Sequence, residues 1–430
     1  MQQHENPIDP SNANTRRAFL KATGTAVLAA GLARGVHAAG SDELRLGLVG
    51  CGGRGTGAAV QALQADDGTR LVALADAFGD RLESSLKSLR NSPVADRVAV
   101  DADRRFVGFD ACRQLVDSGV DVVLLAAPPH FRPRHLKLCI DAGKHVFAEK
   151  PVAVDAPGIR SVLATTEEAR RKNLSIVSGL CWRYETGMQK TMEQIHEGRI
   201  GEITSLESTR YLQGVGKLAP RQPGWTDMEY QMRNWYYYTW LSGDFIVEQF
   251  VHELDKMAWA MDGEYPIRCY CTGGRQTRVE PEYGHVYDHF NAVFEYAGGA
   301  RLYAGTRHQR GCDGVRFDFA RGTKGACELM KYTITGENPW QWDGKRTVMH
   351  QLEHDAMYAA MRRGETINNG EYMARSTMMA ILARMSAYTG KTLTWEQAMG
   401  SQEDLSPPRY DWDVPLPEPP VAMPGVTPFV

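Results

Sequence analysis

In the first part of the chain, short apolar runs alternate with longer stretches whose apolar residues have helical spacing. The runs lie at residues 46–49, 71–75, 120–127 and 144–148. Their length and continuous apolar character are typical of strands buried on both faces. Strands that alternate with helices form parallel βα units. We therefore predict an α/β protein whose first domain, residues 41–173, is a doubly wound parallel sheet of the Rossmann type.

The pattern changes beyond residue 175. Alternating apolar and polar positions predict strands at residues 203–212, 267–272, 286–296, 300–309 and 325–333. Glycine-containing turns join several of them, and strands joined by tight turns pair in an antiparallel manner. Helical spacing returns at residues 349–363 and 371–388. We predict an α+β domain with a large, mainly antiparallel sheet over residues 174–400, and a proline-rich tail over residues 401–430.

A glycine-rich turn follows the first predicted strand. It reads Gly50-Cys51-Gly52-Gly53-Arg54-Gly55. Glycines at these positions let the chain turn sharply and let its backbone approach a pyrophosphate at the N-terminus of the next helix. The second strand ends at Asp76, whose carboxylate can bind both adenosine ribose hydroxyls and repel a 2′-phosphate. Although such a turn alone is a weak signal, this order of elements predicts a dinucleotide site for NAD, with NADP less favoured.

Two further strands end in motifs that should meet this turn. One ends in Ala127-Pro128-Pro129-His130 and the next in Glu149-Lys150-Pro151. Ligands of open parallel sheets bind outside the carboxyl ends of the strands. We therefore expect all three motifs to line one crevice.

The N-terminus has the features of an export signal. Arg16 and Arg17 are followed by Phe19 and Leu20, a weakly apolar stretch over residues 22–32, and small residues at 36–39. This order matches the twin-arginine (Tat) pattern, although an amphipathic surface helix is an alternative. The apolar stretch is too short for a stable membrane span. We predict that residues 1–40 are a signal read by the Tat export machinery, and that the mature protein is periplasmic or otherwise extracytoplasmic.

Charge and cysteine content exclude several classes of protein. The chain has 49 Lys and Arg against 52 Asp and Glu, a net charge of −3, so it lacks the basic footprint of a nucleic-acid-binding protein. None of the eight cysteines forms a C-x-x-C pair, which favours small buried side chains over a zinc site or a disulfide framework. We expect no metal site.

Taken together, these motifs resemble the Gfo/Idh/MocA family of nucleotide-dependent sugar and cyclitol oxidoreductases. The resemblance covers roughly residues 44–399. Beyond the motifs above, it rests on Asp121-Val122-Val123, Ala142-Gly143-Lys144-His145-Val146, Gly198-Arg199-Ile200-Gly201 and Thr389-Gly390-Lys391. Because the open sheets of this family commonly pack face to face, the resemblance also implies a homo-oligomer.

The family pattern implies roles for individual residues. Lys150 would face the substrate, and Glu149 would contact the nicotinamide ribose. His252 begins the sequence His252-Glu253-Leu254-Asp255, which matches the family's H-x-x-D pattern and makes His252 the catalytic histidine. Glu248 stands where the family usually has aspartate, so its role is open.

The same residues suit alcohol oxidation on chemical grounds. Glu248, His252 and Asp255 have the spacing i, i+4 and i+7 within an apolar stretch over residues 243–262, which predicts one helix that projects all three from one face. As a hydride leaves for the nicotinamide, His252 would take the hydroxyl proton. Lys150 would polarise that hydroxyl or form a structural ion pair, and Glu248 or Asp255 would orient the imidazole. A core histidine held by its neighbours is the alternative.

Aromatic and polar side chains of the second domain are candidates for substrate binding. Rings can pack against apolar sugar faces while charged and hydroxyl groups bind sugar hydroxyls. An arginine also recurs in the family at position 183. Ordinary core packing is the alternative for each of these candidates, which are Arg183, Tyr184, Trp235, Tyr236 and His289.

The sequence therefore favours an exported NAD(P)-dependent oxidoreductase acting on a secondary alcohol of a sugar, cyclitol or sugar acid. Free NAD is scarce outside the cytoplasm, so we expect the cofactor to be bound tightly. Two alternatives remain open: a redox-neutral glycosidase or lyase resembling glycoside hydrolase family 109, which works through a transient 3-keto sugar, and a non-catalytic sugar-binding relative. The presence of Lys150 favours the oxidoreductase.

Overall fold

The computed structural model describes residues 43–214 and 218–430. The expected export signal at residues 1–40 lies outside the described residues. In the described part of the chain, no helix combines the length and the apolar character needed to cross a membrane.

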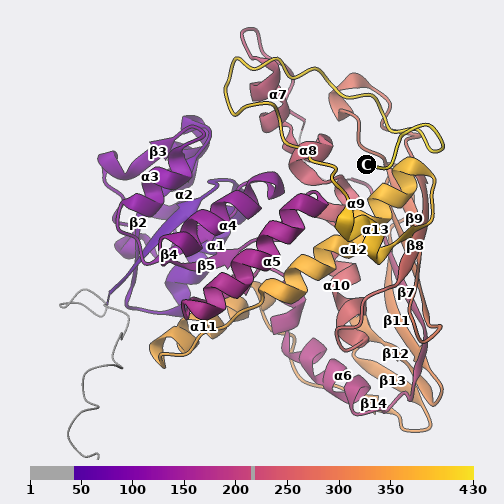
Figure 1. Ribbon diagram of the computed structural model, residues 1–430. Helices are drawn as coiled ribbons and strands as arrows, with labels where there is room; N and C mark the ends of the chain where they lie inside the picture. The colour runs from indigo at the N-terminus through magenta and orange to yellow at the C-terminus, as the bar shows by residue number, and fades with distance from the viewer. Residues whose placement is uncertain (1–42, 215–217) are drawn as a thin grey trace, which may run out of the picture. The chain divides into compact units, whose positions relative to one another are not determined.

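The first domain contains a six-stranded parallel sheet in the order β3-β2-β1-β4-β5-β6 (Figure 1). This confirms the predicted doubly wound sheet, in which the strand order reverses between β1 and β4. β6 lies beyond the expected domain boundary at residue 173, so the parallel sheet extends past that boundary. The strands are β1 (Leu44–Val49), β2 (Thr69–Asp76), β3 (Arg105–Val107), β4 (Val122–Leu125), β5 (His145–Ala148) and β6 (Ile176–Ser178).

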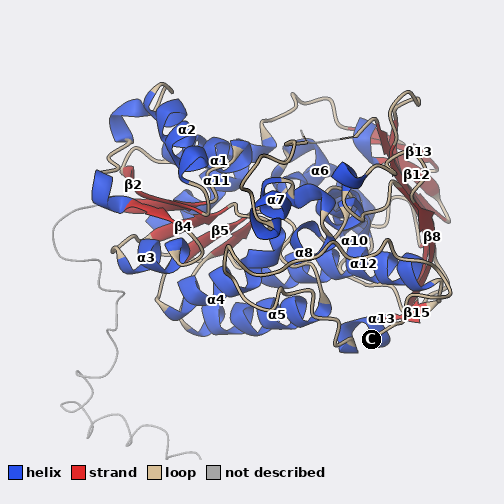
Figure 2. Cartoon of the chain, turned by 90° about the horizontal axis from the view of Figure 1, so that it is seen from above, coloured by secondary structure: helices blue, strands red, loops and turns tan. Residues whose placement is uncertain are grey.

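Helices cover both faces of this sheet (Figure 2). Alternate residues of β1 point to opposite faces, so Leu46 and Leu48 pack with one group of helices and Val49 with the other. α1, α2 and the much later α11 lie on the first face, and α3, α4 and α5 lie on the second. The helices of this domain are α1 (Gly53–Ala65), α2 (Gly79–Arg90), α3 (Ala111–Asp117), α4 (Arg132–Asp141) and α5 (Ala156–Arg171).

The second domain contains a nine-stranded sheet in the order β14-β13-β12-β11-β7-β10-β9-β8-β15. Only β7 and β10 pair in parallel, which confirms the predicted mainly antiparallel sheet. The strand predicted at residues 325–333 is divided between β12 and β13. The strands are β7 (Ile203–Leu212), β8 (Arg268–Gly274), β9 (His289–Glu295), β10 (Arg301–His308), β11 (Val315–Gly322), β12 (Gly325–Glu328), β13 (Thr333–Gly336), β14 (Trp340–Gln341) and β15 (Leu393–Thr394).

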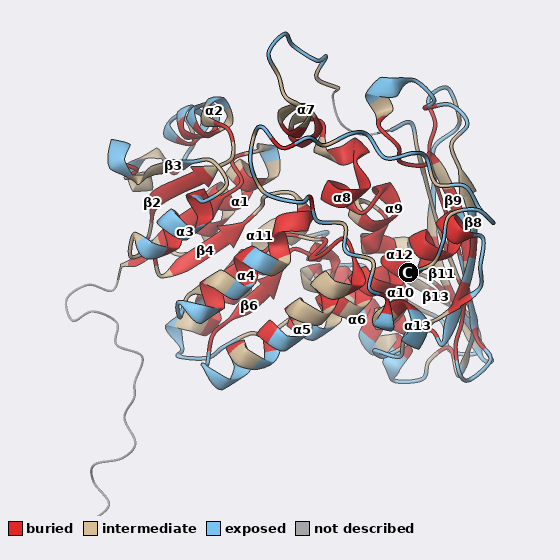
Figure 3. Ribbon diagram, turned by 45° about the horizontal axis from the view of Figure 1, so that its top comes forward, coloured by how far each residue is buried: buried red, intermediate tan, exposed pale blue. Residues whose placement is uncertain are grey.

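Helix α12 joins the two domains. It packs against α5 on one side and against β8 and α10 on the other, and it is buried over most of its length (Figure 3). The remaining α-helices are α6 (Thr186–His196), α7 (Asp227–Arg233), α8 (Thr239–Ser242), α9 (Phe245–Glu248), α10 (Val251–Ala260), α11 (Met349–Arg362), α12 (Gly370–Thr389) and α13 (Trp395–Gly400). The 3₁₀ turns are η1 (Ala95–Arg97), η2 (Ala102–Arg104), η3 (Pro129–Phe131), η4 (Cys181–Tyr184), η5 (Trp235–Tyr237), η6 (Pro281–Tyr283) and η7 (Leu329–Lys331).

The single helix predicted over residues 243–262 is wrong. The chain forms two helices, α9 and α10, with a break between Glu248 and Val251. At the break, the Phe250 amide donates to the Phe245 carbonyl at 3.3 Å, a wider turn than that of an α-helix. Glu248 therefore lies on a separate helix, whereas His252 and Asp255, three positions apart on α10, share a helical face.

The C-terminal tail, residues 401–430, has neither helix nor strand but is held along its length. Gln231 Nε2 donates to the Leu416 carbonyl at 2.7 Å, and the Tyr287 hydroxyl donates to the Ala422 carbonyl at 2.9 Å. In Figure 1 the tail is the yellow strand-free segment that passes near α7 and α8. The tail is thus fixed to the chain that carries it.

Candidate functional site

The glycine turn has the geometry that a phosphate needs. A Cβ at Gly50 would lie 2.3 Å from the Ala127 backbone nitrogen, and one at Gly55 would lie 1.9 Å from the Gly50 carbonyl oxygen. These two glycines therefore permit the close approach of turn, strand and helix. A Cβ at Gly52 or Gly53 would instead meet nothing within 4 Å, so the backbone at the N-terminus of α1 is open to a ligand.

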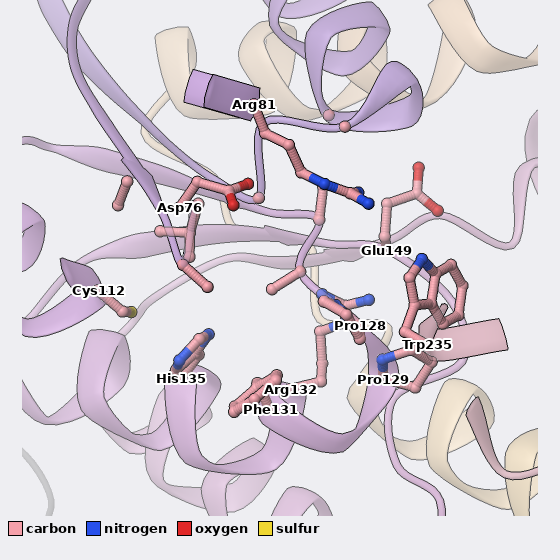
Figure 4. Close-up of a pocket in the computed structure, with 18 of the residues that line it drawn as sticks. Asp76, Arg81, Cys112, Pro128, Pro129, Phe131, Arg132, His135, Glu149 and Trp235 are labelled. Atoms are coloured by element: carbon pink, nitrogen blue, oxygen red, sulfur yellow. The ribbon is translucent and has the colours of Figure 1, made fainter. Parts of the chain in front are cut away.

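A cavity of about 400 Å³ lies above this turn, at the carboxyl ends of the parallel strands (Figure 4). Asp76 lies at one end of the cavity, and Glu149 and Trp235 lie at the other, while Lys150 also lines the cavity (Figure 4). The three strand-terminal motifs of the sequence meet here, as expected. The predicted residues that line the cavity are Gly50, Gly52, Gly53, Arg54, Gly55, Asp76, Ala127, Pro128, Glu149, Lys150, Trp235 and Glu248.

Asp76 is held in place by the backbone. Its Oδ2 accepts a hydrogen bond from the Cys51 amide at 2.6 Å, and its Oδ1 accepts one from the Phe78 amide at 2.9 Å. Burial raises the pKa of Asp76, while these two hydrogen bonds oppose the shift. The carboxylate thus lies beside the glycine turn in the position that an adenosine ribose would require.

Lys150 connects the two domains at the cavity wall. Its Nζ donates to Glu248 Oε1 at 2.9 Å and to the Glu248 backbone carbonyl at 2.6 Å. Lys150 follows β5 of the first domain, and Glu248 ends α9 of the second. Glu248 therefore positions the ammonium group that the E-K-P motif supplies.

Glu149 faces the glycine turn. Its Oε1 lies 3.0 Å from Arg54 Nε, and its Oε2 accepts a hydrogen bond from the Lys150 amide at 3.2 Å. Arg54 also donates to Gln61. Glu149 and Arg54 thus form an ion pair across the cavity wall.

His252 lies near this centre but does not line the 400 Å³ cavity. It is partly exposed, and its buried Nδ1 has no hydrogen-bond partner among the described residues. Burial, followed by the positive charges of Lys150 and Arg210, holds the pKa of His252 well below its ordinary value. The imidazole is therefore neutral at pH 7, and its lowered pKa makes it a weaker base than an ordinary histidine.

A buried ion pair joins two of the predicted site residues, Arg183 and Asp255. Asp255 accepts three hydrogen bonds from Arg183, the two shorter being Nε–Oδ2 at 3.0 Å and Nη2–Oδ1 at 2.8 Å, and a fourth from Ser376. The Arg183 guanidinium also lies over the rings of Trp259 and Tyr372. Asp255 thus bonds to Arg183 and Ser376, and the charge of Arg183 is satisfied within the protein.

Other predicted residues also have structural contacts. His130 bonds to the Tyr410 hydroxyl at 2.8 Å, and burial lowers the pKa of His130 to about 4. The Tyr184 hydroxyl donates to Asn369 at 2.7 Å. None of these side chains lines the 400 Å³ cavity. His130 therefore binds the C-terminal tail in this structure, and its role as a cofactor contact stays a prediction.

Two more of the substrate candidates, Tyr236 and His289, lie away from the cavity and contact other parts of the protein. Tyr236 is buried and stacks on His308 with ring centroids 6.2 Å apart. His289 Nδ1 lies 2.8 Å from Asp288 Oδ1, and neither residue lines the cavity. Of the five candidates, Trp235 alone lies at the cavity.

Several residues that line the cavity were not predicted from the sequence. Arg132 is buried beneath the cavity, where its Nη1 donates to the Leu125 carbonyl at 3.0 Å, and Arg81 extends across the other side (Figure 4). Phe78 and Phe109 line the end beside Asp76. Their positions just after the strand-terminal motifs at residues 76, 107 and 128–130 were an available signal, because the segments that follow parallel strands surround the ligand.

The fold and the site define a two-domain dinucleotide-binding protein, and comparison with known families gives the same class. Residues 44–176 match the "Oxidoreductase family, NAD-binding Rossmann fold", and residues 188–328 match the "GFO/IDH/MocA C-terminal domain". Together these matches cover more than half of the chain. The chain belongs to the Gfo/Idh/MocA family.

Individual relatives are distant. An inositol 2-dehydrogenase of Rhizobium meliloti (strain 1021) is 25% identical over 258 residues, which are 60% of this chain and 66% of that protein. A dTDP-3,4-didehydro-2,6-dideoxy-alpha-D-glucose 3-reductase of Actinomadura kijaniata is 26% identical over 171 residues, which are 40% of this chain and 46% of that protein. The matches therefore span from about half to just under two thirds of these relatives' lengths.

A solved structure shows the same fold. The aldose-aldose oxidoreductase from Caulobacter crescentus, complexed with glycerol, aligns with a TM-score of 0.63 at 15% sequence identity. The alignment covers 82% of this chain and 99% of that chain. Both domains of the architecture are thus shared with a known protein.

Proposed function

We propose that this chain is an NAD-dependent oxidoreductase that moves a hydride between a secondary alcohol of a sugar, cyclitol or sugar acid and a nicotinamide ring. The contact between Lys150 and Glu248 carries the proposal, because it fixes an ammonium group from the E-K-P motif in the wall of the cavity that the glycine turn and Asp76 also line. The names of the relatives, an inositol dehydrogenase and a deoxysugar reductase, support the substrate class.

Residues of this chain would transfer the hydroxyl proton during the reaction. When bound, the nicotinamide supplies the hydride acceptor. Lys150 donates a hydrogen bond to the reacting oxygen, and Glu248 holds the ammonium in place. His252, neutral because its pKa is lowered, takes the hydroxyl proton in oxidation and returns it in reduction.

The open backbone at Gly52 and Gly53 and the carboxylate of Asp76 support NAD in preference to NADP. A 2′-phosphate beside Asp76 would meet a negative charge in a poorly solvated site. Arg81 lies in the same part of the cavity and would balance only part of that repulsion.

The tail supports tight retention of the cofactor. Trp412 packs on Phe78 at 5.2 Å and on Phe109 at 4.6 Å between ring centroids, and both phenylalanines line the cavity. Release of a nucleotide past these rings would require the tail to move. Slow release is what an enzyme needs where free NAD is scarce.

Export and self-association complete the proposal. The Arg16-Arg17 motif supports Tat export to the periplasm, and export in the folded state is compatible with a retained cofactor. Tyr270 on β8 and Tyr303 on β10 are exposed on the second sheet, which supports packing of this sheet against a second copy. Light scattering of the purified chain tests the association.

The first experiment is to purify the chain, denature it, and identify any released nucleotide by mass and absorbance. We expect about one NAD or NADH per chain after dialysis, a stoichiometry set by the single glycine turn. Sugars, cyclitols and aryl glycosides are then tested for turnover. Net oxidation of an alcohol to a keto product, or net reduction of a keto substrate to an alcohol, supports the oxidoreductase. Release of an aglycone without net redox change supports the redox-neutral glycosidase. Protein that binds no nicotinamide nucleotide contradicts the proposal.

A further inference from the structure

A second group of reactive side chains lies beside Lys150, outside the nucleotide cavity. Cys181 is in η4, and His350 and Glu353 are in the first turns of α11. One potential ligand atom from each residue, the thiol sulfur, an imidazole nitrogen and a carboxylate oxygen, lies within 4.8 Å of the other two. His350 and Glu353 are three positions apart on one helix, so they share a face.

Cys181 and Glu353 are buried, His350 is partly exposed, and the group is poorly satisfied. Glu353 is 0% exposed, and neither of its carboxylate oxygens has a hydrogen-bond partner among the described residues. His350 Nδ1 lies 3.5 Å from Glu353 Oε1 and likewise makes no hydrogen bond in the described part of the chain. An unpaired buried carboxylate is costly, so such a group normally has a proton or a cation beside it.

The neighbouring cations are already engaged. Arg54 acts electrostatically on Glu353, but its guanidinium lies 3.0 Å from Glu149 Oε1 and also donates to Gln61. Lys150 is bonded to Glu248. Arg54 and Lys150 are therefore bonded to Glu149 and Glu248, and among the described residues neither Lys nor Arg forms an ion pair with Glu353.

We propose that Cys181, His350 and Glu353 bind one divalent metal ion, with Zn²⁺ favoured. A thiolate, an imidazole and a carboxylate are all zinc ligands, whereas Mg²⁺ and Ca²⁺ prefer oxygen donors alone. Zn²⁺ would balance the charges of one thiolate and one carboxylate. Binding would require the three ligand atoms to converge to about 2.0–2.3 Å from the ion.

Three protein ligands leave a fourth tetrahedral position open, which is the arrangement of catalytic zinc sites. The charges of Glu149 and Lys150 act on the Cys181 thiol, and the open position is free for a further ligand. A water or a substrate oxygen could occupy it. Metal binding itself does not depend on the proposed sugar chemistry.

The test uses the full purified chain after treatment with a chelator. Titration with Co²⁺ should give about one equivalent of binding, with the near-ultraviolet band of a cobalt–thiolate bond and visible bands of tetrahedral cobalt. Zn²⁺ should abolish both features by displacement, whereas Mg²⁺ should not. Nucleotide binding is measured on the same samples, so a failure of the metal site is distinguishable from a failure of the proposed enzyme.

Variants locate the ligands. Cys181→Ser should remove the charge-transfer band, and Glu353→Gln should weaken Co²⁺ binding by about tenfold or more. Cys327→Ser, a change at another buried cysteine outside the cluster, should leave both unchanged. If a variant at a buried position fails to fold, His350→Asn, at a partly exposed position, replaces it as the test of the ligand set. Absence of the thiolate band, or equal binding by C181S, would overturn the proposal and leave Glu353 as a neutral carboxylic acid.

Discussion

Lys150 contacts both domains and is central to the proposed chemistry. It follows a strand of the first sheet, yet its ammonium group is fixed by Glu248 of the second domain. The sequence predicted the importance of both residues, but it could not show that one positions the other. Their separation of 98 positions along the chain hides the contact.

Replacing Lys150 by Met should lower turnover by at least about 100-fold, because the reacting oxygen loses its hydrogen-bond donor. The dissociation constant for NAD should change little, since the glycine turn and Asp76 are untouched. Steady-state kinetics and calorimetry measure the two quantities. Lys137→Met, at an exposed lysine on α4, is the matched control. Unchanged turnover in K150M would remove Lys150 from the mechanism.

Asp76→Asn should reduce the preference for NAD over NADP by about tenfold, or about 1.4 kcal/mol, because the charge that repels a 2′-phosphate is lost. Competition binding with both nucleotides gives the ratio of dissociation constants. Asp80→Asn removes an acid from the exposed part of α2 and should leave the ratio as it is. An unaltered ratio in D76N would mean that another group selects the cofactor.

His308 should make stability depend on pH. Burial lowers its pKa to about 3 in the folded protein, whereas the unfolded value is about 6.5. At pH values between these two pKa values, the unfolded chain binds a proton at His308 that the folded chain does not bind. The free energy of unfolding therefore falls by about 1.4 kcal/mol per pH unit as the pH decreases. Urea unfolding of His308→Phe from pH 6 to pH 4 should show a shallower loss than the wild type. Equal slopes would contradict this assignment.

At the scale of elements, the strands of the parallel sheet were predictable because both of their faces are apolar. The break between α9 and α10 was not, since apolar residues continue through it and only the backbone hydrogen bond at Phe250 marks the wider turn. The role of the tail was also hidden. Its prolines exclude regular structure, but its contacts with Phe78, Phe109 and His130 depend on the folded chain.

Trp412→Ala should therefore speed the release of NAD by roughly tenfold or more, as expected for the loss of aromatic packing worth about 1.4 kcal/mol. Stopped-flow displacement of bound NADH measures the rate by its fluorescence. Trp395→Ala, which removes a ring packed on Tyr265 away from the cavity, is the control. Equal release rates in W412A and the wild type would mean that the tail does not retain the cofactor.

At the scale of the whole molecule, the functional centre is assembled from parts that the sequence keeps far apart. Motifs at strand ends identified the nucleotide end, because the rule for parallel sheets places them together. No such rule predicts that Cys181, His350 and Glu353 lie close together. The cysteine of this cluster lies far along the chain from the other two residues, so no local spacing indicated a metal site, and the return of α11 to the first domain brings the three together.

The most direct measurement is the transfer of deuterium in a single turnover. The chain, loaded with NAD, is mixed with sugars and cyclitols carrying deuterium on the reacting carbons, and the nucleotide is examined by mass spectrometry. We predict deuterium on the nicotinamide ring of the wild type, and none above background in K150M although the nucleotide stays bound. Substrate conversion without label on the nucleotide, or equal labelling in both proteins, would contradict the proposed hydride transfer beside Lys150.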